Sequence, residues 1–163
     1  PTSLVFNGGP WTMSDGNRTA TRATDGTAHQ FTDLLANSGK WMARFTLVAN
    51  THDVGDTYFG LYTIDLSSYV LFVADGTGPF TSGFSSDGPL TLAAGDVLDL
   101  LYDGDAGVVV IRKNGTPACT VTIGTNQAVY PDVVRGPVAG GTIVWTIAAE
   151  IPTADVPSGY TVR

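Results

Sequence analysis

Apolar and polar side chains alternate in short runs along this chain, and glycine, aspartate, asparagine and proline separate the runs. A period of two is typical of β-strands that bury one face, and the separating residues favour tight turns. We predict strands at residues 3–6, 19–23, 40–49, 57–64, 68–74, 97–102, 107–112, 116–123, 129–134 and 142–149. The pattern predicts an all-β fold, a two-sheet antiparallel β-sandwich of the lectin-like jelly-roll kind.

Two further segments, 31–36 and 150–163, are not predicted to be strands. The run FTDLLA at 31–36 is compatible with one short helix or turn. We predict one sandwich domain at 1–149, because no repeat or linker interrupts the strand pattern. The residues at 150–163 contain two prolines and are predicted to form an extended C-terminal tail.

The clearest local motif is a three-stranded meander made of 97–102, 108–112 and 118–123. Asn114-Gly115 predicts a tight hairpin turn between its last two strands, because both turn residues must adopt positive φ. The segment 103–107 (DGDAG) lies where the preceding turn must be.

Composition and charge support the β prediction and exclude several partners. The 163 residues include 22 Thr and 14 Asp but a single Glu and two Lys, so residues that favour helices are scarce. The net charge of −7 argues against nucleic-acid binding and against binding to anionic lipid. It is compatible with a soluble protein that binds neutral partners such as glycans.

The one cysteine and the absence of long apolar runs exclude further possibilities. Cys119 is predicted to be a small buried hydrophobe, and no internal disulfide can form. The N-terminal residues show no signal-peptide pattern, and Pro1 is compatible with a mature start. No run approaches the length of a membrane span, so we expect a soluble chain.

Five segments, considered together, are similar to one known family. They are TMSDGNRTATRA (12–23), SGKWMARFTL (38–47), YFGLYT (58–63), GDVLDLLYDGDAGVVVIRKNGTPACTVTI (95–123) and VYPDVVRGPVAGGTIVWTI (129–147). Their order and spacing resemble those of SPRY domains from about Trp11 to Ile147. The chain departs from the family pattern at Arg44, where glutamate is usual, and at 65–94, which is short and lacks a tryptophan.

The resemblance implies a bent β-sandwich related in shape to legume-type lectins. SPRY domains are mostly recognition modules rather than enzymes, and their ligands meet loops at one end of the sandwich. Eukaryotic members mostly bind peptides or proteins. Similar domains also occur in phage tail and head appendages, where the expected ligand is a host glycan or receptor.

The titratable residues do not form a recognisable catalytic pattern. His29 and His52 lack a partner at metal-binding spacing, and we expect both in surface loops. Glu150 lies near the tail, and Asp99 is the only acid inside an otherwise apolar strand, so paired carboxylates for glycoside hydrolysis are not evident. The sequence therefore predicts a protein that is not an enzyme and needs no metal or cofactor.

Asp103 and Asp105 allow two interpretations. A calcium loop needs oxygen ligands from several alternating positions, whereas Ala106 and Gly107 supply no side-chain oxygen. Both acids are common in turns, and we favour the turn. A partial ion site, or a ligand contact completed by a distant loop, stays open.

Aromatic residues are the remaining candidates for a binding surface. Phe80 and Phe84 lie in a Gly/Ser/Pro-rich segment, where they either fold back over the core or contact a ligand. Asp75 and Asp87 are their polar neighbours. The further candidate ligand residues are Tyr58 and Tyr62, whereas Trp41 and Trp145 are predicted to be core residues.

We hypothesise a recognition module on a virion or extracellular surface appendage that binds a host-surface glycan or receptor. The expected partners include other virion proteins and further copies of the chain in a homo-oligomer, but not nucleic acid or a membrane. The alternative is a structural virion component that docks on neighbouring subunits without binding sugar. A eukaryotic-type adaptor and a small glycan hydrolase are less favoured.

Overall fold

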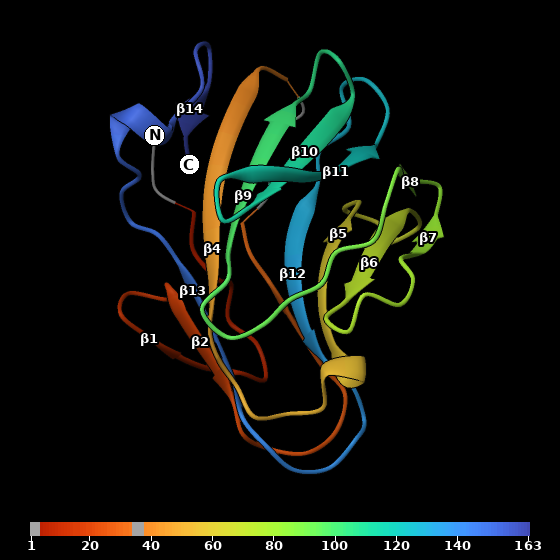
Figure 1. Ribbon diagram of the computed structural model, residues 1–163, viewed down its shortest axis with the longest axis vertical. Coiled ribbons are helices and arrows are strands. Elements are labelled where there is room, and N and C mark those ends of the chain that lie inside the picture. Colours follow the sequence, from red (N-terminus) through yellow and green to blue (C-terminus); the bar gives the residue numbers. More distant parts are fainter. Residues whose placement is uncertain (1–3, 34–37) are drawn as a thin grey trace.

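Two β-sheets pack face to face in the computed structural model, which describes residues 4–33 and 38–163 (Figure 1). The nine-stranded sheet has the spatial order β1 (Thr12–Ser14), β2 (Thr19–Arg22), β13 (Ile143–Ile147), β4 (Lys40–Asn50), β9 (Val97–Asp103), β10 (Val108–Lys113), β11 (Thr116–Thr122) and β8 (Ser85–Ser86), and β14 (Thr161–Val162) pairs with β4. The five-stranded sheet has the order β3 (Ala28–Phe31), β12 (Tyr130–Arg135), β5 (Thr57–Tyr62), β6 (Tyr69–Val73) and β7 (Phe80–Ser82). Two 3₁₀ turns, η1 (Val54–Asp56) and η2 (Thr153–Asp155), are the helical segments of the described residues, and neither is long enough to span a membrane.

The predicted all-β sandwich is confirmed, and nine of the predicted strands are present with shifts of one or two residues at their ends. The segment 3–6 differs, because Phe6 forms only an isolated bridge with Thr32 and residue 3 lies outside the described residues. For the predicted helix or turn at 31–36, Phe31 ends β3 and residues 34–36 lie outside the described residues. Pattern analysis missed β1, β3, β7, β8 and β14, which are two to four residues long and too short to show a clear alternation.

The meander around the Asn-Gly turn forms as predicted. Lys113 pairs with Thr116 across the turn, and Asn114 and Gly115 adopt φ values of 51° and 82°. The DGDAG segment connects β9 to β10, and the amide of Gly107 donates to the carbonyl of Asp103 to close the turn. Local turn chemistry therefore fixes the register of three adjacent strands.

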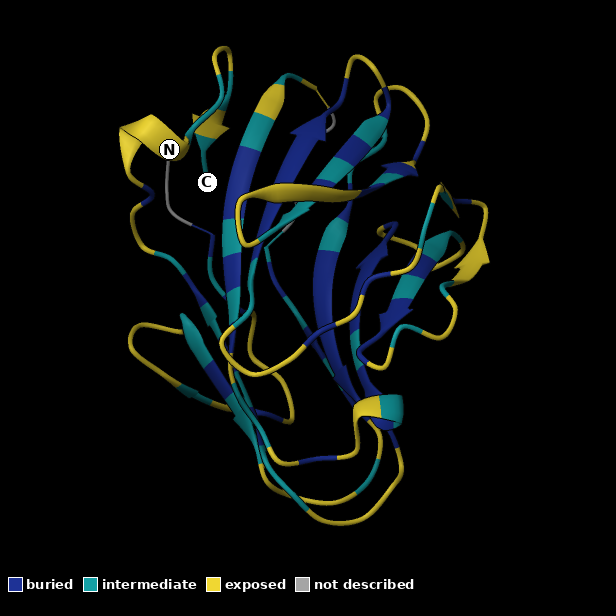
Figure 2. Cartoon of the chain, viewed as in Figure 1, coloured by how far each residue is buried: buried dark blue, intermediate teal, exposed yellow. Residues whose placement is uncertain are grey.

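The core lies between the sheets and is rich in aromatic rings. Phe45 of β4 packs edge-on against Phe59 of β5 with centroids 5.2 Å apart, and Phe59 in turn contacts Trp145 of β13 at 5.6 Å. Most residues of the central strands are buried or half-buried, whereas much of the connecting loops is exposed (Figure 2). Cys119 is buried at this interface, as predicted, and burial raises the pKa of its thiol to about 11.

The residues after Ala149 pack back onto the nine-stranded sheet. β13 pairs with only the C-terminal half of β4, from Phe45 to Asn50, and β14 pairs in parallel with Trp41 and Met42. The tail thereby supplies hydrogen bonds to strand backbone that β13 does not reach. Ile151 packs in a small second cluster on the outer side of this sheet.

Candidate functional site

The outward side of the five-stranded sheet carries an unusual number of aromatic side chains. Phe59, Leu61, Val70 and Val133 point into the core, so the alternate residues of the same strands point outward. We call the outward residues Phe31, Tyr62, Tyr69 and Tyr130 the aromatic face; they come from β3, β5, β6 and β12, which are adjacent in the sheet. An outward sheet face is commonly polar, whereas here Tyr62 is buried and Phe31, Tyr69 and Tyr130 are half-buried, so the rings form a partly accessible apolar layer.

The rings of the aromatic face pack against one another in a continuous row. Phe31 contacts Tyr62 at 5.6 Å and Tyr130 at 6.2 Å, both edge to face. Tyr62 stacks on Tyr69 at 5.4 Å with an interplanar angle of 24°. These distances are those of favourable aromatic pairs, so the row is held in place before any ligand arrives.

Gly60 makes room for this row. It lies on the outward side of β5, opposite Asp132 of β12 and Leu71 of β6. A Cβ atom at this position would lie 2.9 Å from a ring carbon of Tyr62 and 3.0 Å from a methyl of Leu71. The missing side chain thus allows Tyr62 to lie flat over the sheet.

A histidine–aspartate pair borders the aromatic face. His29 Nδ1 lies 2.7 Å from Oδ2 of the fully buried Asp132, whose Oδ1 accepts from the amide of Gln30 at 3.0 Å. The hydrogen bond to Asp132 raises the pKa of His29, and burial raises the pKa of Asp132, so the pair retains a shared proton toward higher pH. The imidazole stacks on Phe31 at 5.8 Å and is half-exposed.

An apolar groove continues the aromatic face at the end of the sheet where β12 begins. It has a volume of about 320 Å³ and is lined by Asn7, Gly8, Phe31, Ile64, Leu66 and Tyr130. Ile64 and Leu66 are 65% and 52% exposed, which is unusual for large aliphatic side chains. The groove has the size and the apolar character of a small ligand site.

The turn that presents Ile64 and Leu66 is stabilised by its own hydrogen bonds. The hydroxyl of Thr63 donates to Asp65 Oδ1 at 2.6 Å, and the amide and hydroxyl of Ser67 donate to the same oxygen at 3.0 and 2.7 Å. These donors, Thr63 first, lower the pKa of Asp65 to about 2. The exposed aliphatic side chains therefore project from an ordered turn.

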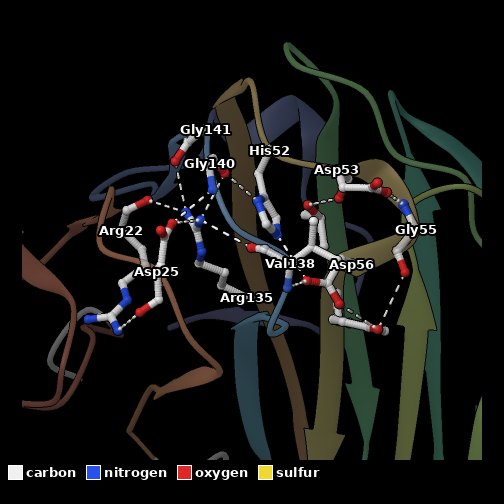
Figure 3. Close-up of polar contacts among 12 residues, drawn as sticks. Arg22, Asp25, His52, Asp53, Gly55, Asp56, Arg135, Val138, Gly140 and Gly141 are labelled. Carbon is white, nitrogen blue, oxygen red and sulfur yellow. Dashed lines mark hydrogen bonds and ion pairs between the residues drawn. The ribbon is translucent and has the colours of Figure 1, made fainter.

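A second polar arrangement fixes the loops at the opposite end of β12, the lower end of Figure 1. The buried guanidinium of Arg135 donates to the carbonyls of Gly140 and Gly141 at 2.8 Å and to Asp25 Oδ1 at 2.9 Å. Figure 3 shows these bonds converging on Arg135 from separate loops. A buried charge is tolerated only with such partners, and here they join the loops after β2 and β12.

His52 and Asp56 extend this network. His52 Nδ1 is 2.7 Å from the carbonyl of Gly140, and Nε2 is 3.1 Å from Asp56 Oδ2. Asp56 Oδ2 also accepts from the amide of Val138 at 2.7 Å (Figure 3). The loops before η1 and after β12 are thus held together by buried side chains.

The positions of the two histidines differ from the prediction. His29 lies on strand β3 and His52 is buried, so neither occupies a surface loop as expected. Each is paired with an aspartate, His29 with a residue 103 positions away. Pattern analysis missed the first pair because only the fold brings its members together, whereas His52 and Asp56 are only four positions apart and meet across the start of η1.

The predicted aromatic ligand residues fall into different environments. Tyr62 belongs to the aromatic face, and Tyr58 lies on the same outward side, where its hydroxyl contacts Gly55 and Asp56. Phe80 of β7 is 55% exposed and pairs with Leu71, which places it on this side as well. Phe84 instead folds into the core, so it offers no exposed ring to a ligand.

The predicted acidic ligand residues mainly organise turns. Asp75 accepts from the amide and hydroxyl of Thr77, and Asp87 accepts from the amide of Thr120. Asp103 forms an ion pair with Lys40 at 3.0 Å and accepts from the amide of Ala106, whereas Asp105 is exposed. The fold does not bring these four aspartates to the aromatic face.

Comparisons with known proteins bear on the fold. No family model and no curated protein matches the sequence. The structure is similar to the SPRY domain of human HERC1, with 18% identity over 85% of this chain and 91% of that chain and a TM-score of 0.64. It is also similar to the NEUZ (NHR) domain of Neuralized from Drosophila melanogaster (14% identity, 90% and 91% covered, TM-score 0.57).

A third similar structure is the carbohydrate binding module CBM66 from Bacillus subtilis, with 10% identity over 90% of this chain and 94% of that chain and a TM-score of 0.50. At these identities the likeness concerns the fold alone. The fold is therefore a SPRY-like β-sandwich, as the sequence motifs predicted.

Proposed function

We propose that this chain is a non-catalytic recognition module that binds a glycan on its aromatic face. The observation that carries the proposal is the preformed row of rings that leads into the apolar groove. Sugar rings present apolar C–H surfaces that stack on aromatic side chains, and their hydroxyls need nearby hydrogen-bonding groups. Among the described residues, Asn7 Oδ1 and His29 Nε2 have no hydrogen bond and border the rings or the groove.

The chemistry around His29 supports binding rather than catalysis. Its described contacts are the carboxylate of Asp132 and the rings of Phe31 and Tyr62. A nucleophilic mechanism would require a serine, cysteine or lysine within hydrogen-bonding distance of the imidazole. The pair instead orients a polar ring at the border of an apolar surface.

We also propose where this recognition module acts. The resemblance to domains of phage appendages and the Thr- and Asp-rich, Lys- and Glu-poor composition support a virion or cell-surface appendage. Its partner there is a host-surface glycan. The similarity in fold to a carbohydrate binding module is compatible with this ligand class.

The direct test is a glycan-array screen of the purified chain, with calcium and with chelator, followed by titration calorimetry on the best hit. We expect Tyr130→Ala and Phe31→Ala each to weaken binding by about tenfold or more, because truncation of a central aromatic contact costs over ~1 kcal/mol. Tyr160→Ala is the matched control, since Tyr160 packs near Lys40 on the other sheet. A folded chain that binds no glycan, or binds equally well without both rings, contradicts the proposal.

A second candidate function is docking on a neighbouring protein through the loops around Arg135. Val54 and Val138 are exposed on these loops, and the hydrogen bonds of Arg135 and Asp56 fix the loops in advance. This arrangement favours the structural-component alternative, because pre-ordered loops lose little entropy on binding. Loss of particle or oligomer assembly in Val138→Asp, with glycan binding intact, would favour this candidate over the first.

A further inference from the structure

A polar cleft lies on the outward side of the nine-stranded sheet, away from the aromatic face. Its volume is about 420 Å³, and its charged lining residues are Arg44 of β4, Asp99 of β9, Arg112 of β10 and Asp155 of η2. The 3₁₀ turn of the C-terminal segment thus forms one wall. The size is within the range of sites for small molecules.

Asp99 holds two arginine side chains together in this cleft. Arg44 Nε and Nη2 donate to both oxygens of Asp99, at 2.6 and 3.1 Å, and Arg112 Nη2 donates to Oδ2 at 2.9 Å. The hydrogen bond to Asp99 raises the pKa of Arg44, so the guanidinium keeps its charge. One buried carboxylate therefore orients two cations, and their combined charge exceeds that of Asp99 by one unit.

Asp155 supplies the missing negative charge. Its carboxylate lies 2.9 Å from Arg44 Nη1, and its carbonyl accepts from Arg112 Nη2 at 2.9 Å. The side chain is 44% exposed, and an exposed ion pair of this kind is weak. Within the described residues, Arg112 Nε is buried without any hydrogen-bond partner.

The C-terminal segment is anchored on both sides of Asp155. Ile151 packs against Met42 and Leu101 before the turn, and β14 pairs with Trp41 and Met42 after it. The Asp155 side chain can therefore leave Arg44 by rotation alone, while the wall of the cleft stays in place. A competing anion would meet preformed donors rather than a collapsed surface.

We propose that this cleft is a carboxylate-binding site in which Asp155 occupies the position of the ligand's carboxylate. The guanidinium groups of Arg44 and Arg112 are the binding groups, since planar guanidinium suits carboxylate geometry. Asp99 is a positioning residue, and Asp155 is a built-in competitor. The ligand is an organic acid of monosaccharide or amino-acid size, given the volume of the cleft.

The test is NMR titration of the full chain, following the Nε–H signals of Arg44 and Arg112 with acetate, glucuronate and N-acetylaspartate amide. We expect shifts at millimolar ligand, and about fivefold tighter binding by Asp155→Asn, because that variant removes the competing ion pair. Comparison of glucuronate with N-acetylaspartate amide distinguishes a sugar acid from a peptide carboxylate as the source. Arg112→Gln should abolish the shifts.

Asp15→Asn is the matched control, since it makes the same charge change on the exposed β1–β2 turn and lines no part of the cleft. If Asp15→Asn strengthens binding as much as Asp155→Asn, the gain is a net-charge effect and the competitor role of Asp155 is refuted. Absence of shifts with every carboxylate in folded Asp155→Asn overturns the site. A response to sulfate without a response to acetate overturns its assignment to carboxylates. Because the aromatic face lies on the other sheet, none of these results depends on glycan binding there.

Discussion

Replacement of Arg135 by methionine should destabilise the protein substantially. The guanidinium is fully buried and donates three bonds of 2.8 to 2.9 Å, to Gly140, Gly141 and Asp25. Hydrogen bonds of charged groups contribute about 1.5–3 kcal/mol each, so their loss removes roughly 4.5–9 kcal/mol. Methionine fills a similar volume and avoids the desolvation cost of a buried cation, which is several kcal/mol.

The difference between these two terms gives an expected loss of about 2–4 kcal/mol in the free energy of unfolding. The former partners limit the loss, because Asp25 is 61% exposed and can return to water. For a domain of this size, each kcal/mol changes Tm by roughly 2–4 °C, so we expect Tm to fall by about 4–16 °C. Calorimetry and urea unfolding measure the two quantities independently.

Arg22→Met is the control for this experiment, because Arg22 is a less buried arginine of the same network. Its guanidinium donates to the carbonyl of Asp25 (Figure 3) and to the carbonyl of Pro10. Its replacement should cost about 1 kcal/mol or less. If Arg135→Met is as stable as the natural chain, apolar packing substitutes fully for the guanidinium. The loops would then not depend on this buried charge.

Two further predictions concern titratable side chains. The pKa of His29 is raised in the folded state above its ordinary value of 6.5, so its stabilising contribution is complete below about pH 6.5 and is lost as pH rises through the folded pKa. The difference in unfolding free energy between the natural chain and His29→Gln should therefore shrink from about pH 5.5 to about pH 8.5, and a constant difference would contradict the role of the Asp132 pair. Cys119 is buried with a pKa raised to about 11, so a thiol reagent at about pH 8 should modify the folded chain about two orders of magnitude more slowly than the unfolded chain. Equal rates would show that the thiol is accessible.

The sequence predicts those parts of the fold that depend on neighbouring residues. Asn114-Gly115 fixes a hairpin because only two residues must adopt positive φ. In β4 the alternation at 44–47 (RFTL) shows which face is buried, whereas β9 and β10 are recognisable as strands from their short apolar runs. By contrast, β3 has four residues, and its strand character depends on pairing with β12, about a hundred positions away.

The candidate sites could be predicted only in part, for the same physical reason. Tyr62 was recognisable as a candidate ligand residue, but Phe31 and Tyr130 become its neighbours only when β3, β12 and β5 align. Phe84 was predicted as a candidate ligand residue, but its ring is buried in the core. The sequence therefore indicates which single residues could bind a ligand. It does not indicate which of them lie together on one surface, because that depends on the order of strands in the sheet.

The two outward faces differ in a way that neither composition nor net charge indicates. The aromatic face presents rings and is bordered by His29 and the buried Asp132, whereas the opposite face presents ion pairs around Asp99. Burial of Asp99 costs free energy that its two arginines must offset, and apolar side chains would be equally suitable for folding alone. We therefore propose a different class of ligand for each face, a glycan for the rings and a carboxylate for the arginines around Asp99.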